Sequence, residues 1–145
     1  MTTLDDCFKK GLLRKTQPNI EKAKASLELA KENADDGKVH MSNDMHNWAM
    51  VAAYTSMFHS ARALLFKDGV KERSHFCMAL YVKEKYAGII ESKYLNELNV
   101  LREQRHMIFY GDEELNVTEA EETEADSAVK LAIGFLESVR KIIEK

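Results

Sequence analysis

Apolar residues recur at helical spacing along most of the chain. In one segment they step by three and four positions, at Ile20, Ala23, Leu27, Ala30 and Ala34. Such spacing places them on one face of a helix. Pro18 suits the first turn of this helix, and Gly37 is expected to end it. The pattern predicts an amphipathic helix that buries one side.

A more uniformly apolar helix is predicted next, from about residue 42 or 43 to 68. Because it is apolar over much of its circumference, we expect it to be the central helix. Gly69 should stop it, and Ser74 can cap a fourth helix that runs to about Tyr86. A fifth helix begins near Ser92. The short connections imply antiparallel neighbours.

The two ends of the chain carry helix-start patterns as well. Thr3 and Asp6 can form a capping box for a short peripheral helix, and Thr118 and Glu121 can do so for the last helix. Helical spacing returns in that last helix at Ala125, Ala128, Ala132, Phe135, Val139 and Ile142. No strand pattern appears. The sequence predicts an all-α fold, an antiparallel up-and-down bundle of four main helices plus one or two short ones.

Composition limits the class of protein. The chain has 145 residues, 45% of them hydrophobic and 31% charged, with one proline. This is the composition of a folded protein of one-domain size, so we expect a single helical domain over residues 1–145. The formal charge of −3 argues against a broad basic face for a DNA duplex. A local cationic site remains compatible with that charge.

Targeting and cysteine usage give further expectations. The first residues lack the layout of a signal peptide, and no segment approaches the roughly 18 apolar residues of a membrane span. We therefore expect a cytoplasmic protein that does not enter a membrane. Cys7 and Cys77 have neither zinc-site spacing nor the pattern of a disulfide framework. Two reduced thiols are expected.

The common enzyme motifs are absent from the sequence. It has no Gly-rich phosphate loop, no His-Glu-x-x-His helix and no Gly-x-Ser-x-Gly elbow. A carboxylate di-metal bundle would need Glu-x-x-His pairs on facing helices, and none occurs near the apolar stripes. The sequence thus predicts neither a metal nor a cofactor. The densest polar cluster beside an apolar stripe is LREQRHMIFYGDE, residues 101–113.

Arg105 is the unusual residue of that cluster. At about 100° per residue it lies within roughly 20° of Leu98 and 40° of Leu101 around the helix. Its guanidinium is therefore expected to point toward another element. It could pair with a core carboxylate or a helix end, or extend past the stripe. Alternatively it could bind an anion, because its planar fork suits phosphate, with His106 exchanging a proton near neutral pH.

Two segments together resemble the HEPN family. They are AYTSMFHSARALLFKDGVKERSHF, residues 53–76, and LREQRHMIFYGDEE about thirty residues later. The resemblance covers roughly residues 17–143. It implies a four-helix bundle that forms a homodimer. It also implies a partner protein, a minimal nucleotidyltransferase, in a toxin–antitoxin or related system.

Catalytic members of this family share an Arg-x(4 to 6)-His motif that cleaves RNA without a metal at a dimer cleft. The resemblance aligns Arg105 with the motif arginine, His106 with the polar residue after it, and Tyr110 with the motif histidine. Tyr110 is a departure, since a phenol with a pKa near 10 is a poor base at neutral pH. An Arg102-x-x-x-His106 alignment keeps the residue types but is one residue too short.

Two hypotheses follow from these residues. In the first, a nucleotide or RNA phosphate binds around Arg105, His106 and Tyr110, and an active enzyme would be an endoribonuclease. Arg105 would stabilise the pentacovalent phosphate, His106 would be the acid or base, and Tyr110 would orient the substrate. The residues assigned to binding are Arg102, Asp112 and Tyr54. In the second, the chain is a catalytically silent dimeric interaction module that partners a nucleotidyltransferase.

Overall fold

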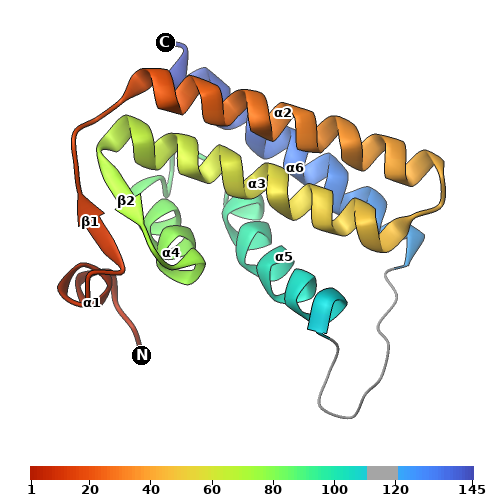
Figure 1. The fold of residues 1–145 in the computed structure, drawn as a ribbon, viewed down its shortest axis with the longest axis horizontal. Helices are drawn as coiled ribbons and strands as arrows, with labels where there is room; N and C mark the ends of the chain where they lie inside the picture. Colours follow the sequence, from red (N-terminus) through yellow and green to blue (C-terminus); the bar gives the residue numbers. More distant parts are fainter. Residues whose placement is uncertain (111–120) are drawn as a thin grey trace.

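The computed structural model describes residues 1–110 and 121–145, without the side chains of 108–110. Its elements in order are α1 (Leu4–Lys9), β1 (Leu13–Lys15), α2 (Ile20–Ser42), α3 (His46–Asp68), β2 (Val70–Glu72), α4 (His75–Lys85), α5 (Ser92–Tyr110) and α6 (Glu122–Ile143). The predicted all-α bundle of four long and two short helices is confirmed (Figure 1).

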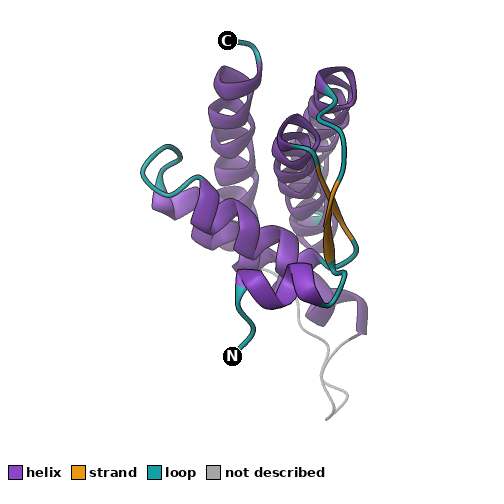
Figure 2. Cartoon of the chain, turned by 90° about the vertical axis from the view of Figure 1, so that its left-hand side faces the viewer, coloured by secondary structure: helices purple, strands orange, loops and turns teal. Residues whose placement is uncertain are grey.

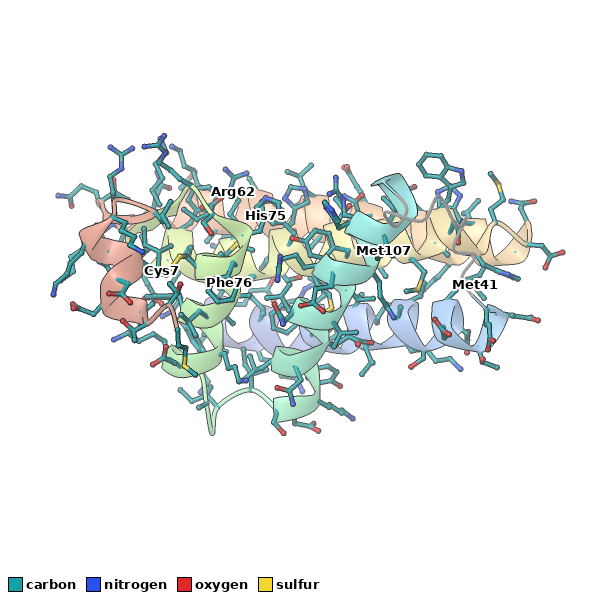
Figure 3. The ribbon with its side chains drawn as sticks, turned by 90° about the horizontal axis from the view of Figure 1, so that it is seen from below. Cys7, Met41, Arg62, His75, Phe76 and Met107 are labelled. Carbon is teal, nitrogen blue, oxygen red and sulfur yellow. A yellow bond between two sulfur atoms is a disulfide. The ribbon has the colours of Figure 1, made fainter. Side chains whose placement is uncertain are left out.

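The four long helices reverse direction in turn along the chain (Figure 1). α3 packs along both α2 and α6, as expected for a central helix, and α5 crosses beneath α3 and α6 at an oblique angle (Figure 3). α4 is short and lies beside α5, below one end of α3. Within the described residues, no helix is both long and apolar enough to cross a membrane.

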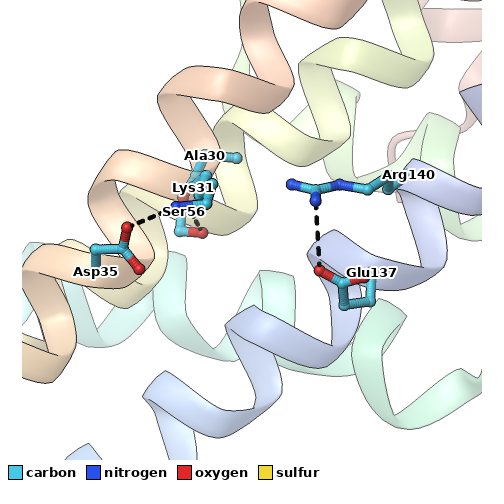
Figure 4. A network of polar contacts seen from close by, with 6 residues as sticks. All are labelled: Ala30, Lys31, Asp35, Ser56, Glu137 and Arg140. Atoms are coloured by element: carbon cyan, nitrogen blue, oxygen red, sulfur yellow. Dashed lines mark hydrogen bonds and ion pairs between the residues drawn. The ribbon is translucent and has the colours of Figure 1, made fainter. Parts of the chain in front are cut away.

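Small side chains bring α2 and α3 close together. Two buried serines at this interface donate hydrogen bonds across it. Ser26 Oγ donates to the carbonyl of His59 at 2.7 Å. Ser56 Oγ donates to the carbonyl of Ala30 at 2.8 Å, the bond drawn in Figure 4. A buried hydroxyl must find such a partner, and a neighbouring helix supplies it only when the backbones approach closely. These bonds set the register of α3 against α2.

The ends predicted for α2 are wrong. The helix runs through Gly37 to Ser42, and Asn19, which follows Pro18, is the N-cap, accepting a hydrogen bond from the Lys22 amide at 3.0 Å. Gly37 is there for packing. A Cβ at Gly37 would lie 3.2 Å from Cγ2 of Val129 on α6. The missing side chain therefore lets α6 approach α2 rather than ending the helix.

A two-stranded antiparallel ribbon was not predicted. β1 pairs with β2, with Leu13 opposite Glu72 and Lys15 opposite Val70 (Figure 2). Three-residue strands are too short to show an alternating pattern. The predicted stop at Gly69 is confirmed, since Gly69 caps α3 with a φ of 76°. A Cβ there would lie 2.6 Å from the carbonyl oxygen of Thr16, so the chain directly after β1 passes against this turn.

The expectation of two reduced cysteines is wrong. Cys7 on α1 and Cys77 on α4 form a disulfide, with their Cα atoms 5.9 Å apart. That separation is ordinary for a disulfide. Their separation of 70 positions hid the pairing in the sequence, because only the packing of α1 on α4 brings them together. The N-terminal segment is thus attached by a covalent bond as well as by the ribbon.

A carboxylate at the end of α3 holds the far end of α4. Tyr81 and Tyr86 each donate a hydrogen bond from the phenol oxygen to Asp68 Oδ2, at 3.0 and 2.7 Å. Lys67 Nζ pairs with Asp68 Oδ1 at 3.2 Å. Burial, together with the Asp68 charge, raises the pKa of both tyrosines, so they remain protonated donors. α4 is therefore connected to α3 near its C-terminal end.

Candidate phosphate-binding site

Tyr54 and His75 form the centre of a polar and aromatic cluster. Tyr54 lies on α3, and His75 is the first residue of α4, directly after the capping Ser74. Tyr54 Oη is 2.7 Å from His75 Nδ1. Burial raises the pKa of Tyr54 to about 12, so its phenol keeps its proton and can donate it to Nδ1. In that tautomer Nε2, the other ring nitrogen, carries the proton; in the alternative tautomer Nδ1–H donates to the phenol oxygen and Nε2 carries the lone pair.

The histidine ring is also held by an aromatic contact. Phe58, one turn after Tyr54 on α3, has its ring centroid 4.5 Å from that of His75, and the two planes are inclined by 35°. The Tyr54 and His75 centroids are 6.1 Å apart. Two residues on one side of α3 therefore orient the imidazole. Tyr54 does so through a hydrogen bond with Nδ1, and Phe58 through the contact between the two rings.

Three arginines surround this centre. The guanidinium carbon of Arg105 lies 5.8 Å from the ring centroid of Tyr54. Arg62 lies 5.5 Å from the ring centroid of Phe58, and Arg102 lies 5.7 Å from that of Phe76. Figure 3 shows Arg62, His75 and Phe76 near one another beside α4. Guanidinium groups commonly sit over aromatic faces in this way.

Burial and the neighbouring charges together lower the pKa of His75. Partial burial of the ring is the first cause that lowers the pKa of His75, and the positive charge of Arg105 is the second. Glu72 opposes them, while Arg102 and Arg62 add smaller lowering effects. The imidazole is therefore neutral at pH 7 although its surface is partly exposed.

The cluster has an excess of positive charge. Glu72 Oε1 lies 2.8 Å from Arg62 Nε, off the direction of the N–H bond, so this contact is an ion pair rather than a hydrogen bond. Arg102 is 3.7 Å from the exposed carboxylate of Glu103, where solvent weakens the pairing. Among the residues that the structure describes, three arginines face two carboxylates, and the neutral imidazole adds no charge. An anion is the ligand that this arrangement favours.

The sequence-predicted residues divide into three groups. Arg105 does point toward another element, as predicted, because its guanidinium lies over Tyr54 of α3. Arg102 joins the same cluster through Phe76. His106 is an exposed residue of α5. The side chain of Tyr110 and the whole of Asp112 lie outside the described residues.

Three members of the cluster were missed by the sequence predictions: Phe58, Arg62 and His75. His75 directly follows Ser74, the residue predicted to cap the fourth helix, and it is the first residue of that helix. The spacing of Tyr54, Phe58 and Arg62 by four residues was a usable pattern, since it places two aromatic rings and a cation on one helix face. Nothing in the sequence connects that face with His75, because their contact depends on how α4 packs.

Metal ligation is not supported in the described part of the chain. No group of three or more His, Cys, Asp or Glu side chains is placed there to hold an ion. The chemistry available at the cluster is that of hydrogen bonds, fixed positive charge and one imidazole.

Comparison with known proteins identifies the family. Residues 19–142 match the HEPN domain, and the chain therefore belongs to the HEPN domain family. The chain is also similar to the candidate toxin MJ0605 of Methanocaldococcus jannaschii, with 31% identity over 84 residues. The similarity covers 51% of this chain and 63% of that protein's length. α1 and β1 lie before the residues that match the family.

Proposed function

We propose that this protein is a toxin-like HEPN protein that binds an RNA phosphodiester at the cluster around Arg105 and cleaves RNA without a metal. The observation that carries the proposal is the position of the Arg105 guanidinium over Tyr54, whose hydroxyl holds His75. Fixed cations beside an imidazole are the groups that phosphodiester chemistry needs. The family and the name of the relative MJ0605 also support it.

The proposed reaction is attack by the ribose 2′-oxygen on the adjacent phosphorus. A bond forms between the 2′-oxygen and phosphorus, the bond to the 5′-oxygen breaks, and a cyclic phosphate and a 5′-hydroxyl result. Arg105 would stabilise the negative charge on the pentacovalent phosphorus, with Arg102 holding the neighbouring phosphate. Tyr54, buried beneath them, would act by orienting His75.

Proton transfer needs one group for the 2′-oxygen and one for the 5′-oxygen. The geometry supports His75 as the base that takes the 2′ proton, in the tautomer in which Nδ1–H donates to Tyr54 Oη and Nε2 carries the lone pair. Its ring is held in place and is neutral at pH 7. His106, the residue proposed from the sequence, would then return a proton to the departing 5′-oxygen. Tyr110 would orient the substrate, and Asp112 would take part in binding. All of these roles are proposals.

The test is cleavage of total RNA in the presence of a metal chelator. Arg105→Ala should reduce the rate by about 100-fold or more, the usual effect of removing a group that stabilises transition-state charge. Arg14→Ala is the matched control, since Arg14 is an exposed arginine on β1, outside the cluster. Circular dichroism would verify that each variant folds. Equal cleavage by the wild type and Arg105→Ala would contradict the proposal.

A silent module is the second candidate function. Tyr110 stands where catalytic members have histidine, and this favours binding without cleavage. In that case the wild type would bind RNA but leave it intact, and Arg105→Ala would weaken the binding. The activity of the system would then belong to the partner protein.

Assembly and location are proposals as well. We infer that residues 1–145 form one domain, that two copies form a homodimer, and that a nucleotidyltransferase-type protein is the partner. A toxin-like protein that acts on RNA would work in the cytoplasm. Light scattering would measure the mass of the purified protein, and a monomer at micromolar concentration would contradict the dimer. Copurification with a candidate partner would test the complex.

A further inference from the structure

A small cavity lies between α4 and α5, beside the arginine cluster. Its volume is about 300 Å³. α4 contributes Phe76, Leu80 and Lys83, and α5 contributes Leu95, Asn96 and Asn99. The α4 residues are spaced by four and three positions, so they share one helix face. The walls are mainly apolar, with two amides and one ammonium group among them.

Phe76 belongs both to the cavity and to the cationic cluster. It follows His75 in the chain, and 41% of its surface is exposed, which is unusual for a phenylalanine. Its ring lines the cavity, and the Arg102 guanidinium lies 5.7 Å from the ring centroid. Aromatic rings and arginines placed together on a surface are the groups on which unpaired bases stack.

Asn99 connects Arg102 to the cavity by hydrogen bonds. Its Oδ1 accepts from Arg102 Nε at 3.3 Å and from Nη2 at 3.2 Å. These bonds orient the amide, so its NH₂ group faces away from the guanidinium and can donate to another acceptor. A flat apolar wall next to an oriented amide suits a molecule that has aromatic faces and a hydrogen-bonding edge.

We propose that this cavity binds one unpaired base of single-stranded RNA, whose phosphate lies against Arg102 and Arg105. The inference rests on the phosphate site of the proposed function. It adds that the neighbouring cavity selects RNA whose bases are unpaired. A base in a duplex is stacked and paired, so its faces and its edge are not available to Phe76 and Asn99. The protein would therefore distinguish single-stranded from double-stranded RNA.

The volume and charge of the cavity suit a base. A volume of about 300 Å³ is at the lower end of ordinary small-ligand sites. Lys83 lines the cavity, and Arg102 contacts two of its wall residues, so the charges of these side chains suit a phosphate-bearing ligand.

The experiment is fluorescence anisotropy with a labelled RNA hexamer of mixed sequence. The strand is 2′-O-methylated, so that the 2′-oxygen cannot attack the phosphate. It is compared with its duplex and with an abasic strand of the same length. Base stacking contributes about 1–3 kcal/mol, so Phe76→Ala should weaken binding of the single strand by about 5- to 150-fold. Binding of the abasic strand should not change.

Two further variants separate stacking from a general loss of structure. Phe76→Tyr keeps an aromatic ring and should bind the strand nearly as well as the wild type. Leu29→Ala is the matched control, because Leu29 is 44% exposed, close to the 41% of Phe76, and lies on α2 outside the site. It should bind the strand with wild-type affinity.

Each outcome distinguishes the two proposals. If the wild type binds no strand at all, the phosphate site itself is wrong. If the base-bearing and abasic strands bind equally and Phe76→Ala has no effect, the cavity proposal fails while the phosphate site stands. If Phe76→Ala instead converts a dimer to a monomer without changing RNA affinity, the cavity is a contact between two copies, and the proposal is overturned.

Discussion

The hydroxyl of Tyr54 and Nδ1 of His75 lie 2.7 Å apart, although 21 residues separate them in the chain. One residue comes from the middle of the central helix, and the other begins a short helix beside it. The contact joins a buried phenol to an imidazole that reaches the surface. It fixes which nitrogen of His75 can meet a ligand.

Titration of His75 by NMR should give a pKa below 6.5, because partial burial and then Arg105 disfavour its charged form. Arg105→Ala should raise that pKa, since it removes the second of these causes. Arg14→Ala should leave it unchanged. Loss of one histidine signal in His75→Gln would assign the resonance. A pKa that stays the same in Arg105→Ala would contradict the electrostatic account of the cluster.

The free energy of unfolding should also depend on the protonation of His75. Because the pKa of His75 is lowered in the folded state, the unfolded chain takes up the proton first as the pH falls. The contribution of His75 to the free energy of unfolding is present above pH 6.5 and is lost as the pH falls through the folded-state value. Urea unfolding at pH 7 and pH 5 should show a smaller loss in His75→Gln than in the wild type. An equal loss would rule out this contribution.

Ser56→Ala should destabilise the fold by about 1 kcal/mol, since it removes the hydrogen bond to the Ala30 carbonyl. Ser60 is the matched control. It is one turn further along α3 and equally buried, and its hydroxyl has no hydrogen-bond partner within the described part of the chain. Ser60→Ala should be neutral or stabilising. Equal destabilisation of both variants in urea would show that packing, rather than the hydrogen bond, determines the effect.

Gly69→Ala should destabilise the protein by more than Gly88→Ala. Both glycines have positive φ, 76° and 81°, so alanine costs each about 1–2 kcal/mol. Only at Gly69 would the new Cβ meet backbone, at 2.6 Å from the Thr16 carbonyl oxygen, whereas Gly88 has nothing within 4 Å. Thermal unfolding of the two variants would measure the difference. Equal melting temperatures would show that the β1 segment adapts to the added methyl group.

Reduction of the Cys7–Cys77 bond should lower the free energy of unfolding by about 4 kcal/mol, because the bond closes a long loop in the unfolded chain. Urea unfolding with and without a thiol reductant would measure this change. The double variant Cys7→Ser/Cys77→Ser should unfold like the reduced protein and should not respond to the reductant. An identical unfolding midpoint in both conditions would contradict the contribution of the bond.

The sequence predicted well the elements that depend on neighbouring residues. Ser74 caps α4 by accepting from the Cys77 amide at 3.1 Å, and Gly69 ends α3, both as their residue types indicated. It also predicted that Arg105 would face another element, because the apolar stripe of α5 must pack. Gly37 shows the limit of such reasoning. A glycine can end a helix or admit a neighbouring one, and only the position of α6 distinguishes the two.

The candidate site was predicted only in part. Tyr54 of α3 was assigned to binding, and Arg102 and Arg105 are close in sequence and share α5, so their clustering was visible. Phe58, Arg62 and His75 come from elements that meet them only through the packing of α3, α4 and α5. The disulfide and the ribbon were missed for the same reason, since each joins residues more than fifty positions apart.

The attachments of α4 determine which wall of the cavity can move. Near its start α4 is bonded to α1 through Cys77, and at its end Tyr81 and Tyr86 are hydrogen-bonded to Asp68 of α3. A helix held near both ends can neither roll nor tilt without breaking one of these links. The α4 wall is therefore a rigid reference surface. Any widening of the cavity to admit a larger ring must come from displacement of α5, which would carry Arg102 and Arg105 with it.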